Sequence, residues 1–301
     1  MNSSLLSDCE KGGFRGPVKT VVDEYSTTVF DRNGKTVEWG GNTPHGRVER
    51  SYLYDTNGRL TRVRGSSGDN DDAFRYDQGK KQIRHVPARP DLRTGAFGVS
   101  VWFDAISEGE TLTDGGTVET TYNDGDEPVE KRIFDDGGTL LFRIDYIRAE
   151  DGRLSQEKLI TENPAIPKTL RDQIPPDERE SVLAVMKQKF EELAQQTGLF
   201  GNAERVYVYN ERGYVAERHM QQGSIRDDVT FSYNEHGDIS ELTRRINGFP
   251  HEASEEMQLL LRTRRTYEYD SFGNWTSMTE SSESQGNTTT GKHIRQLTYH
   301  E

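Results

Sequence analysis

The chain has 301 residues, of which 31% are hydrophobic and 30% are charged, and it contains 29 glycines. Its formal net charge of -13 opposes nonspecific binding to nucleic-acid phosphates or to anionic membrane surfaces. The single cysteine, Cys9, excludes an intrachain disulfide and a metal site built from several thiolates. The low apolar content argues against a parallel α/β sheet, whose buried strands need nearly continuous apolar runs.

The first residues, Met1 to Lys11, contain neither the basic segment nor the apolar run of a secretory signal. No stretch of the sequence is apolar over the thickness of a bilayer, so we predict no membrane span. As it stands, the chain is expected to be cytoplasmic; if it is a processed form, we expect it to be exported or exposed on the cell surface. Leu5 to Cys9 is at best a distorted lipid-attachment site, and a chance match is the favoured interpretation.

A short motif recurs along the chain. It consists of two aromatic residues spaced by two, then Asp or Asn, then Gly three residues later and an apolar residue two positions further on. The four nearly complete copies are Tyr52–Leu60, Tyr207–Val215, Phe231–Ile239 and Tyr267–Trp275. Weaker copies are Phe30–Val37, Phe134–Leu140 and Ala149–Leu154, while Tyr76–Gly79 and Tyr122–Gly125 are one residue short.

Each fixed position of the motif has a role in a β-hairpin. Aromatic residues spaced by two lie on the same face of a strand. Asp or Asn accepts hydrogen bonds from N–H groups of the turn, and Gly supplies the positive φ that the turn needs. We expect these turn roles for Asp55, Gly58, Asn210, Gly213, Asn234, Gly237, Asp270 and Gly273. Each repeat is therefore predicted to be one antiparallel hairpin. Hairpins that stack on one another bury apolar surface that a single hairpin would leave exposed.

The motif resembles the YD repeats, also called Rhs repeats, of bacterial Rhs proteins, toxin-complex shells and teneurin-like surface proteins. The most similar copies are Tyr267-Glu268-Tyr269-Asp270 with Gly273-Asn274, and Tyr52-Leu53-Tyr54-Asp55 with Gly58. The resemblance extends over two blocks, Val18 to Leu159 and Arg205 to Tyr299. It implies a bacterial origin and stacked hairpins that form a curved or spiral sheet. The chain shows no signature of a self-cleaving segment or toxin domain, and it is too short to close a cargo shell.

Two amphipathic helices are predicted to interrupt the repeats. The first, from Asp177 to Thr197, follows Pro175-Pro176 and precedes Gly198. A shorter one places Ala253, Met257, Leu260 and Leu261 on one face. Covering an exposed part of the sheet is the favoured role for these helices, and binding a partner is the alternative. The predicted organisation is a tail (1–17), a first repeat block (18–163), a linker with a helix (164–200) and a second block (201–301), which together could form one continuous domain.

No local pattern predicts a catalytic residue, a metal site or a cofactor site. His251 and Glu255 lie one helical turn apart, but no third ligand is near, and an acidic helix start is the favoured interpretation. The segment Asp69 to Asp72 supplies oxygen ligands without the Gly and the distal Glu of a calcium loop, so a polar loop is favoured. Most other acids lie at turn positions, which makes them poor candidates for a hydrolytic pair.

Aromatic residues provide the candidates for ligand binding. On repeated strands they could form a platform for sugars or for apolar groups of a partner, although core packing is the favoured alternative. The candidates are Trp39, Trp102, Trp275, Tyr209 and Tyr269. We predict a non-catalytic YD-repeat binding or scaffold protein whose partner is a protein or a glycan and not a nucleic acid. The alternative is a carbohydrate-binding or carbohydrate-active protein that uses the aromatic platform and acidic residues.

Overall fold

The computed structural model describes most of the chain. The described residues are 7–43, 46–65, 72–77, 81–86, 103, 106–107, 115–163, 173–175, 177–178, 180–182, 184–186, 188–189, 192, 202–223, 225–247, 258–284 and 286–301. They are mainly β, which confirms this part of the predicted fold class. No helix in this part of the chain is long and apolar enough to cross a membrane. Trp102, the His251–Glu255 motif and Asp69 to Asp71 lie outside the described residues.

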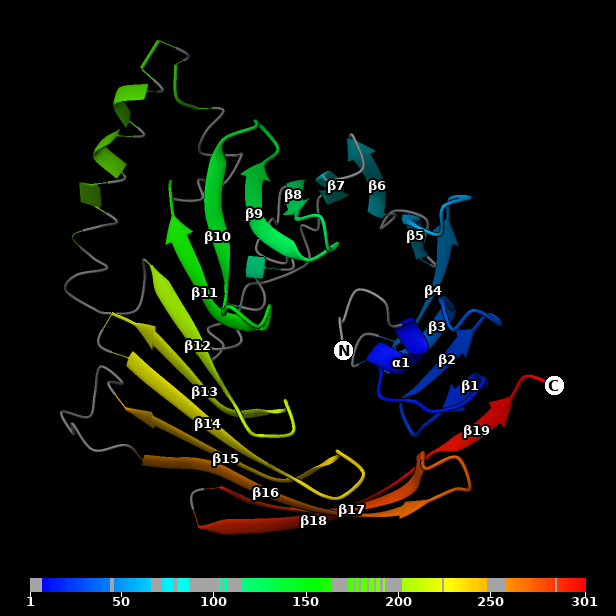
Figure 1. The fold of residues 1–301 in the computed structure, drawn as a ribbon. Helices are drawn as coiled ribbons and strands as arrows, with labels where there is room; N and C mark the ends of the chain where they lie inside the picture. Colours follow the sequence, from blue (N-terminus) through cyan, green and yellow to red (C-terminus); the bar gives the residue numbers. More distant parts are fainter. Residues whose placement is uncertain are drawn as a thin grey trace. The chain divides into compact units, whose positions relative to one another are not determined.

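Helix α1 (Asp8–Lys11) precedes a series of strands that are rich in β-branched and aromatic residues, which pack well on a pleated surface (Figure 1). The strands are β1 (Val18–Val22), β2 (Ser26–Phe30), β3 (Thr36–Thr43), β4 (Gly46–Tyr54), β5 (Leu60–Gly65), β6 (Asp72–Asp77), β7 (Lys81–Val86), β8 (Gly116–Tyr122), β9 (Pro128–Asp135), β10 (Leu140–Arg148), β11 (Leu154–Thr161), β12 (Ala203–Tyr209), β13 (Val215–Gln222), β14 (Ile225–Tyr233), β15 (Ile239–Asn247), β16 (Gln258–Tyr269), β17 (Trp275–Ser284), β18 (Asn287–Ile294) and β19 (Gln296–Tyr299).

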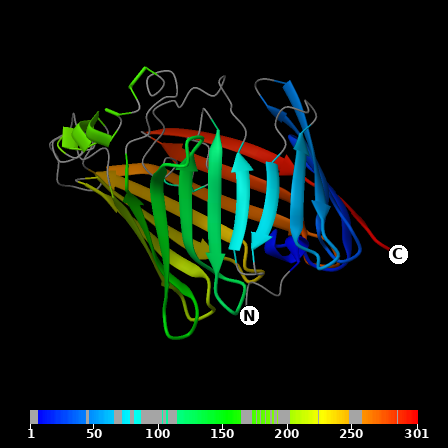
Figure 2. The same cartoon turned by 90° about the horizontal axis from the view of Figure 1, so that it is seen from above.

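The chain divides into two compact units. Unit 1 comprises Met1–Phe74, Ser232–Leu242 and Leu261–Glu301, and unit 2 comprises Arg75–Phe231 and Thr243–Leu260. In unit 1, antiparallel pairing joins β19 to β1 and then runs in chain order to β6, while β16, β17 and β18 pair in the same way. In unit 2, β7 to β14 pair antiparallel in chain order, and the green strands β9 to β11 lie side by side in both views (Figure 2).

The hairpin turns share one hydrogen-bond pattern. The Asp55 carbonyl accepts from the Gly58 N–H at 2.9 Å, and Asp55 Oδ1 accepts from the N–H groups of Asn57 and Arg59 at 2.9 and 2.8 Å. Gly58 has a φ of +77°, in the left-handed region that favours glycine. The same arrangement occurs in the turns that begin at Asp31, Asn210 and Asp270 and place a positive φ at Gly34, Gly213 and Gly273. In a further turn, Asn234 Oδ1 accepts from the Asp238 N–H at 3.0 Å, and Gly237 has a φ of +87°.

One turn keeps this pattern without glycine at the critical position. In the copy that is one residue short, Asn123 Oδ1 accepts from the N–H groups of Gly125 and Glu127 at 2.9 and 3.0 Å. The residue three positions after Asn123 is Asp126, and its φ is +56°. It is the one non-glycine residue with a positive φ in the described part of the chain. The turn therefore has the same length as the others, and Asp126 replaces the expected glycine.

Tyrosine hydroxyls connect one hairpin to another. In three repeats a tyrosine donates to the backbone carbonyl two residues after the turn glycine of another hairpin. The pairs are Tyr54 with Thr36 at 2.7 Å, Tyr209 with Leu154 at 2.8 Å and Tyr267 with Ile239 at 2.7 Å. The aromatic positions of the motif therefore couple hairpins by hydrogen bonds as well as by packing.

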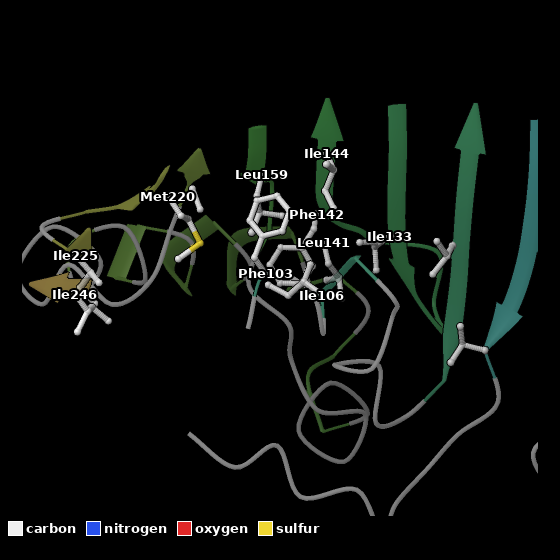
Figure 3. Packing of buried hydrophobic residues seen from close by; sticks show 13 residues of the cluster. Phe103, Ile106, Ile133, Leu141, Phe142, Ile144, Leu159, Met220, Ile225 and Ile246 are labelled. Carbon is white, nitrogen blue, oxygen red and sulfur yellow. The ribbon is translucent and has the colours of Figure 1, made fainter. Parts of the chain in front are cut away.

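Each unit has its own apolar core. In unit 2, Ile133, Ile144, Leu159 and Met220 are buried on β9, β10, β11 and β13 and pack with Phe103, which is 1% exposed (Figure 3). In unit 1 a smaller core contains Cys9, Val18, Val21 and Phe30. Each such side chain contributes about 1.5–3 kcal/mol when it is fully buried. Burial also raises the pKa of the Cys9 thiol.

The two predicted helices have different outcomes. Within 177–197, the described positions 180–182, 184–186, 188–189 and 192 are helical, and the Val182 N–H donates to the Glu178 carbonyl at 3.0 Å. The prediction of the shorter helix is wrong at its C-terminal end, because Leu260 and Leu261 belong to β16. Pairing of β16 with β17 from Arg262 onward extends the strand and outweighs the helical spacing of the leucines. Ala253 and Met257 lie outside the described residues.

Candidate functional site

A cavity of about 490 Å³ opens on the sheet formed by β2, β3, β4 and β5 in unit 1. Cross-strand pairing builds its walls, because residues directly opposite one another on paired strands share a face. One row consists of Val29, Glu38, Ser51 and Arg64. A second row consists of Thr27, Gly40 and Glu49. Each of its members lies two residues from a member of the first row on the same strand, and therefore on the same face of the sheet.

Gly40 leaves the space between the walls open. It lies directly opposite Thr27 on one side and Glu49 on the other. A Cβ atom at Gly40 would have Glu49 Cγ as its nearest neighbour, at 3.7 Å, which is ordinary van der Waals contact. Glycine is therefore not required here by crowding, and its missing side chain contributes directly to the cavity.

Two charges at the cavity remain available to a ligand. Arg47 and Glu49 pair with each other at 3.0 Å, and both are exposed, so this pair contributes little to stability. Glu38 and Arg64 are also exposed, and neither makes an ion pair with any described residue. They lie on either side of Ser51, two strand spacings or about 10 Å apart along the row.

Trp39 borders the cavity, but its indole ring belongs to the other face of the sheet. Side chains of successive strand residues alternate between faces, so Trp39 points away from the face that carries Glu38 and Gly40. The ring packs over Gly41, where a Cβ would lie 2.5 Å from the indole Cη2. The Arg50 guanidinium lies 5.5 Å from the ring centroid. These contacts make Trp39 a packing residue of its own sheet.

Trp275 and Tyr269 are near each other in unit 1, because both lie close to Tyr267. The Tyr267 ring centroid is 6.2 Å from that of Trp275 and 6.0 Å from that of Tyr269. The Arg295 guanidinium lies 3.4 Å from the Trp275 ring centroid, and burial lowers the pKa of Arg295 to about 10. His236 stacks on Tyr269 with centroids 3.9 Å apart. The protein's own groups therefore cover ring faces of both candidates.

Tyr209 lies in unit 2, where its hydroxyl donates to Leu154 and the Arg153 guanidinium lies 4.9 Å from its ring centroid. With Trp102 outside the described residues, the structure brings together only Trp275 and Tyr269 of the five aromatic candidates. The cavity residues Glu38, Gly40, Ser51 and Arg64 were missed from the sequence. The available signal was glycine inside a strand pattern, which often marks a close approach of a ligand or of another backbone.

Unit 2 contains buried charges that pair with each other. Arg205 lies 3.2 Å from Glu157, and the Tyr207 hydroxyl donates to Glu157 at 2.5 Å. Burial, followed by the charge of Glu157, raises the pKa of Tyr207. Asp227 accepts from Arg244 through both carboxylate oxygens, at 2.8 and 2.9 Å. Glu157 and Asp227 are thus each bound to an arginine, as in structural ion pairs.

Among the described residues, no group of three or more His, Cys, Asp or Glu side chains is placed to hold a metal ion. His219 lies 2.8 Å from Asp228 and 2.9 Å from Glu217. Burial raises the pKa of Asp228, but hydrogen bonds from Arg226 and His219 outweigh it and hold that pKa below its usual range. Glu38 and Glu49 both line the cavity and are exposed, unlike the desolvated acid of a glycoside hydrolase.

No protein-family model matches the chain, and no curated protein matches it. Among solved structures, it is similar to a porin-like protein from Bacteroides uniformis, with a TM-score of 0.44, 9% identity and coverage of 95% of this chain and 99% of that one. It is also similar to a porin-like protein from Bacteroides vulgatus, with a TM-score of 0.40, 11% identity and coverage of 94% and 98%. At these TM-scores the similarity supports no inference about function.

Proposed function

We propose that this chain is a non-catalytic binding protein of the YD-repeat type, which presents the cavity on β2 to β5 to a macromolecular partner. The observation that carries this proposal is the row of Glu38, Ser51 and Arg64 beside Gly40, in which both charged side chains are exposed and have no ion-pair partner among the described residues. The volume of about 490 Å³ falls within the range of about 300–1,000 Å³ that is usual for ligand sites.

The YD-repeat part of the proposal is supported by the hairpins themselves. Asp or Asn caps the turn, glycine follows three residues later, and tyrosine hydroxyls bond to other hairpins. The spiral arrangement that the resemblance implies belongs to this proposal. A binding role is favoured over catalysis because turn acids such as Asp55 and Asp270 already accept backbone hydrogen bonds.

Site-specific photo-crosslinking tests the binding role. A benzophenone amino acid is placed at Glu38, inside the cavity, and at Leu53 as a control. Leu53 lies two residues beyond Ser51 on the same strand and face, does not line the cavity and is 38% exposed. We expect a discrete cross-linked species from position 38 only, with both variants melting like the parent. Equal labelling from both positions, or none from position 38, would contradict the proposal.

A carbohydrate-binding or carbohydrate-active protein is the second candidate function. It is favoured by the hydroxyls of Thr27 and Ser51 and the carboxylates of Glu38 and Glu49 at one cavity. Turnover of a glycan separates this candidate from the non-catalytic proposal. If a glycan panel reveals hydrolysis, and Glu49→Gln abolishes it without lowering the melting temperature, the non-catalytic proposal is wrong.

A further inference from the structure

We infer that the group that enters this cavity is a carboxylate-bearing saccharide, with its carboxylate on Arg64 and its hydroxyls on Glu38 and Ser51. The inference rests on the proposed binding function and names the chemistry of the partner at the same site. An acidic polysaccharide would be the corresponding macromolecular partner.

The side chains of the cavity suit a sugar better than a protein surface. Of the residues whose side chains share the cavity face, only Val29 is apolar, and the Trp39 ring lies on the opposite face. Protein partners bind mainly through Trp, Tyr and Arg anchors in well-packed, desolvated pockets. Val29 is the one apolar side chain that the described residues of this cavity face present to an aromatic anchor. Sugar hydroxyls, in contrast, donate readily to carboxylate oxygens such as those of Glu38 and Glu49.

The position of the unpaired charges sets where the acid of the ligand lies. Arg64 has no ion pair among the described residues, whereas Arg47 is engaged by Glu49. A guanidinium binds a carboxylate through two parallel hydrogen bonds, so Arg64 is the natural position for one acidic group. Glu38 repels a second acid and accepts only donors, which sugar hydroxyls supply.

The spacing of the row requires a ligand of some length. Glu38 and Arg64 belong to strands two spacings apart, or about 10 Å. A small anion such as acetate reaches Arg64 but not Glu38. An oligosaccharide spans both charges and passes over Ser51 and the open space at Gly40.

Calorimetric titration with a galactose tetramer that carries a single terminal galacturonate tests the inference, with the neutral galactose tetramer as its matched ligand control. Arg64→Gln removes the carboxylate partner, and Gly40→Leu fills the cavity. Arg62→Gln is the matched protein control, because it removes the same charge from the same strand and face. Arg62 does not line the cavity. Thermal melts show that each variant is folded.

We expect Arg64→Gln and Gly40→Leu to weaken binding of the acidic tetramer by about tenfold or more, and Arg62→Gln to change it by less than about twofold. The neutral tetramer should bind the parent at least about tenfold more weakly. Equal losses in the Arg62 and Arg64 variants, or equal binding of the two tetramers, would overturn the inference. If neither tetramer binds while position 38 cross-links a protein, the saccharide inference fails and the binding function stands. Failure of both experiments contradicts both.

Discussion

Asn274 and Arg15, which are 259 positions apart in the chain, are joined by two amide hydrogen bonds. The Arg15 N–H donates to Asn274 Oδ1 at 2.6 Å, and Asn274 Nδ2 donates to the Arg15 carbonyl at 2.7 Å. Asn274 is 3% exposed, and the Arg15 guanidinium donates to the carbonyls of Gly273 and His236. The segment that follows α1 is therefore held on the turn between β16 and β17.

Replacing Asn274 with Ala should destabilise the protein by about 2–4 kcal/mol, because it leaves two backbone groups of Arg15 without their partner. Urea unfolding measures the loss, and hydrogen exchange should show faster exchange of the Arg15 amide. Asn57→Ala, in an exposed turn, is the control and should change little. A parental unfolding midpoint for Asn274→Ala would show that this contact does not hold the segment.

The stability losses of Gly213→Ala and Gly273→Ala should distinguish the cost of backbone strain from the cost of disturbing the contact with Arg15. Gly213 and Gly273 have φ values of +82° and +81°. A Cβ at Gly213 meets nothing within 4 Å, whereas at Gly273 it lies 3.2 Å from Arg15 Nη1. Gly213→Ala should cost about 1–2 kcal/mol through the left-handed backbone alone, and Gly273→Ala should cost more. Val should cost more still at either position.

Chemical denaturation of the four variants checks this order. Unfolding of both Val variants at the parental denaturant midpoint would show that these hairpin turns are assigned incorrectly. Equal losses for the two Ala variants would show that Arg15 adds nothing at Gly273.

Asp126→Gly should stabilise the protein. The left-handed conformation costs a residue other than glycine about 1–2 kcal/mol, and a new glycine gives back about 0.4–1 kcal/mol through unfolded-state entropy. We therefore expect a net gain of about 0.5 kcal/mol, visible as a higher melting temperature. Asp124→Gly in the same turn is the control and should lower it, since Asp124 has no positive φ. A lower melting temperature for Asp126→Gly would rule out strain at this position.

Asp55→Asn should make stability less sensitive to acid. The backbone N–H of Arg59, more than any other group, holds the pKa of Asp55 below its usual range. A lowered folded-state pKa stabilises the fold above the unfolded value of about 3.9, and this contribution is lost as pH falls through the folded pKa. Asn keeps the Oδ1 acceptor without the charge, as Asn210 shows in its own turn.

Thermal melts between pH 7 and pH 3 measure the difference between the parent and Asp55→Asn. The parent should lose more stability than the variant at the acidic end. Parallel curves would show that the charge of Asp55 contributes nothing to the turn.

The hairpin turns could be predicted because their signals are local. The choice of Asp55 and Gly58 follows from side-chain acceptors and positive φ within a few residues. Asp126 escaped prediction because its conformation is imposed by the strands on either side and not by its own preference. Leu260 was assigned to a helix because spacing alone does not reveal that β17 will pair with the residues that follow it.

The cavity could not be predicted for a related reason. Glu38, Ser51 and Arg64 become neighbours only when the registers of three strands are known, and a shift of one residue would move each to the other face. The contact between Arg15 and Asn274 is even more remote in sequence, and nothing local marks either residue as its partner.

Tyr54, Tyr209 and Tyr267 each donate to a main-chain carbonyl, which belongs to Thr36, Leu154 and Ile239 in turn. A main-chain acceptor is present whatever side chain occupies the position. These three bonds therefore place no requirement on the side chain at the acceptor position, and that side chain can change when a hairpin is duplicated or exchanged. Substitutions on the surfaces of the hairpins could then accumulate while these hydrogen bonds persist.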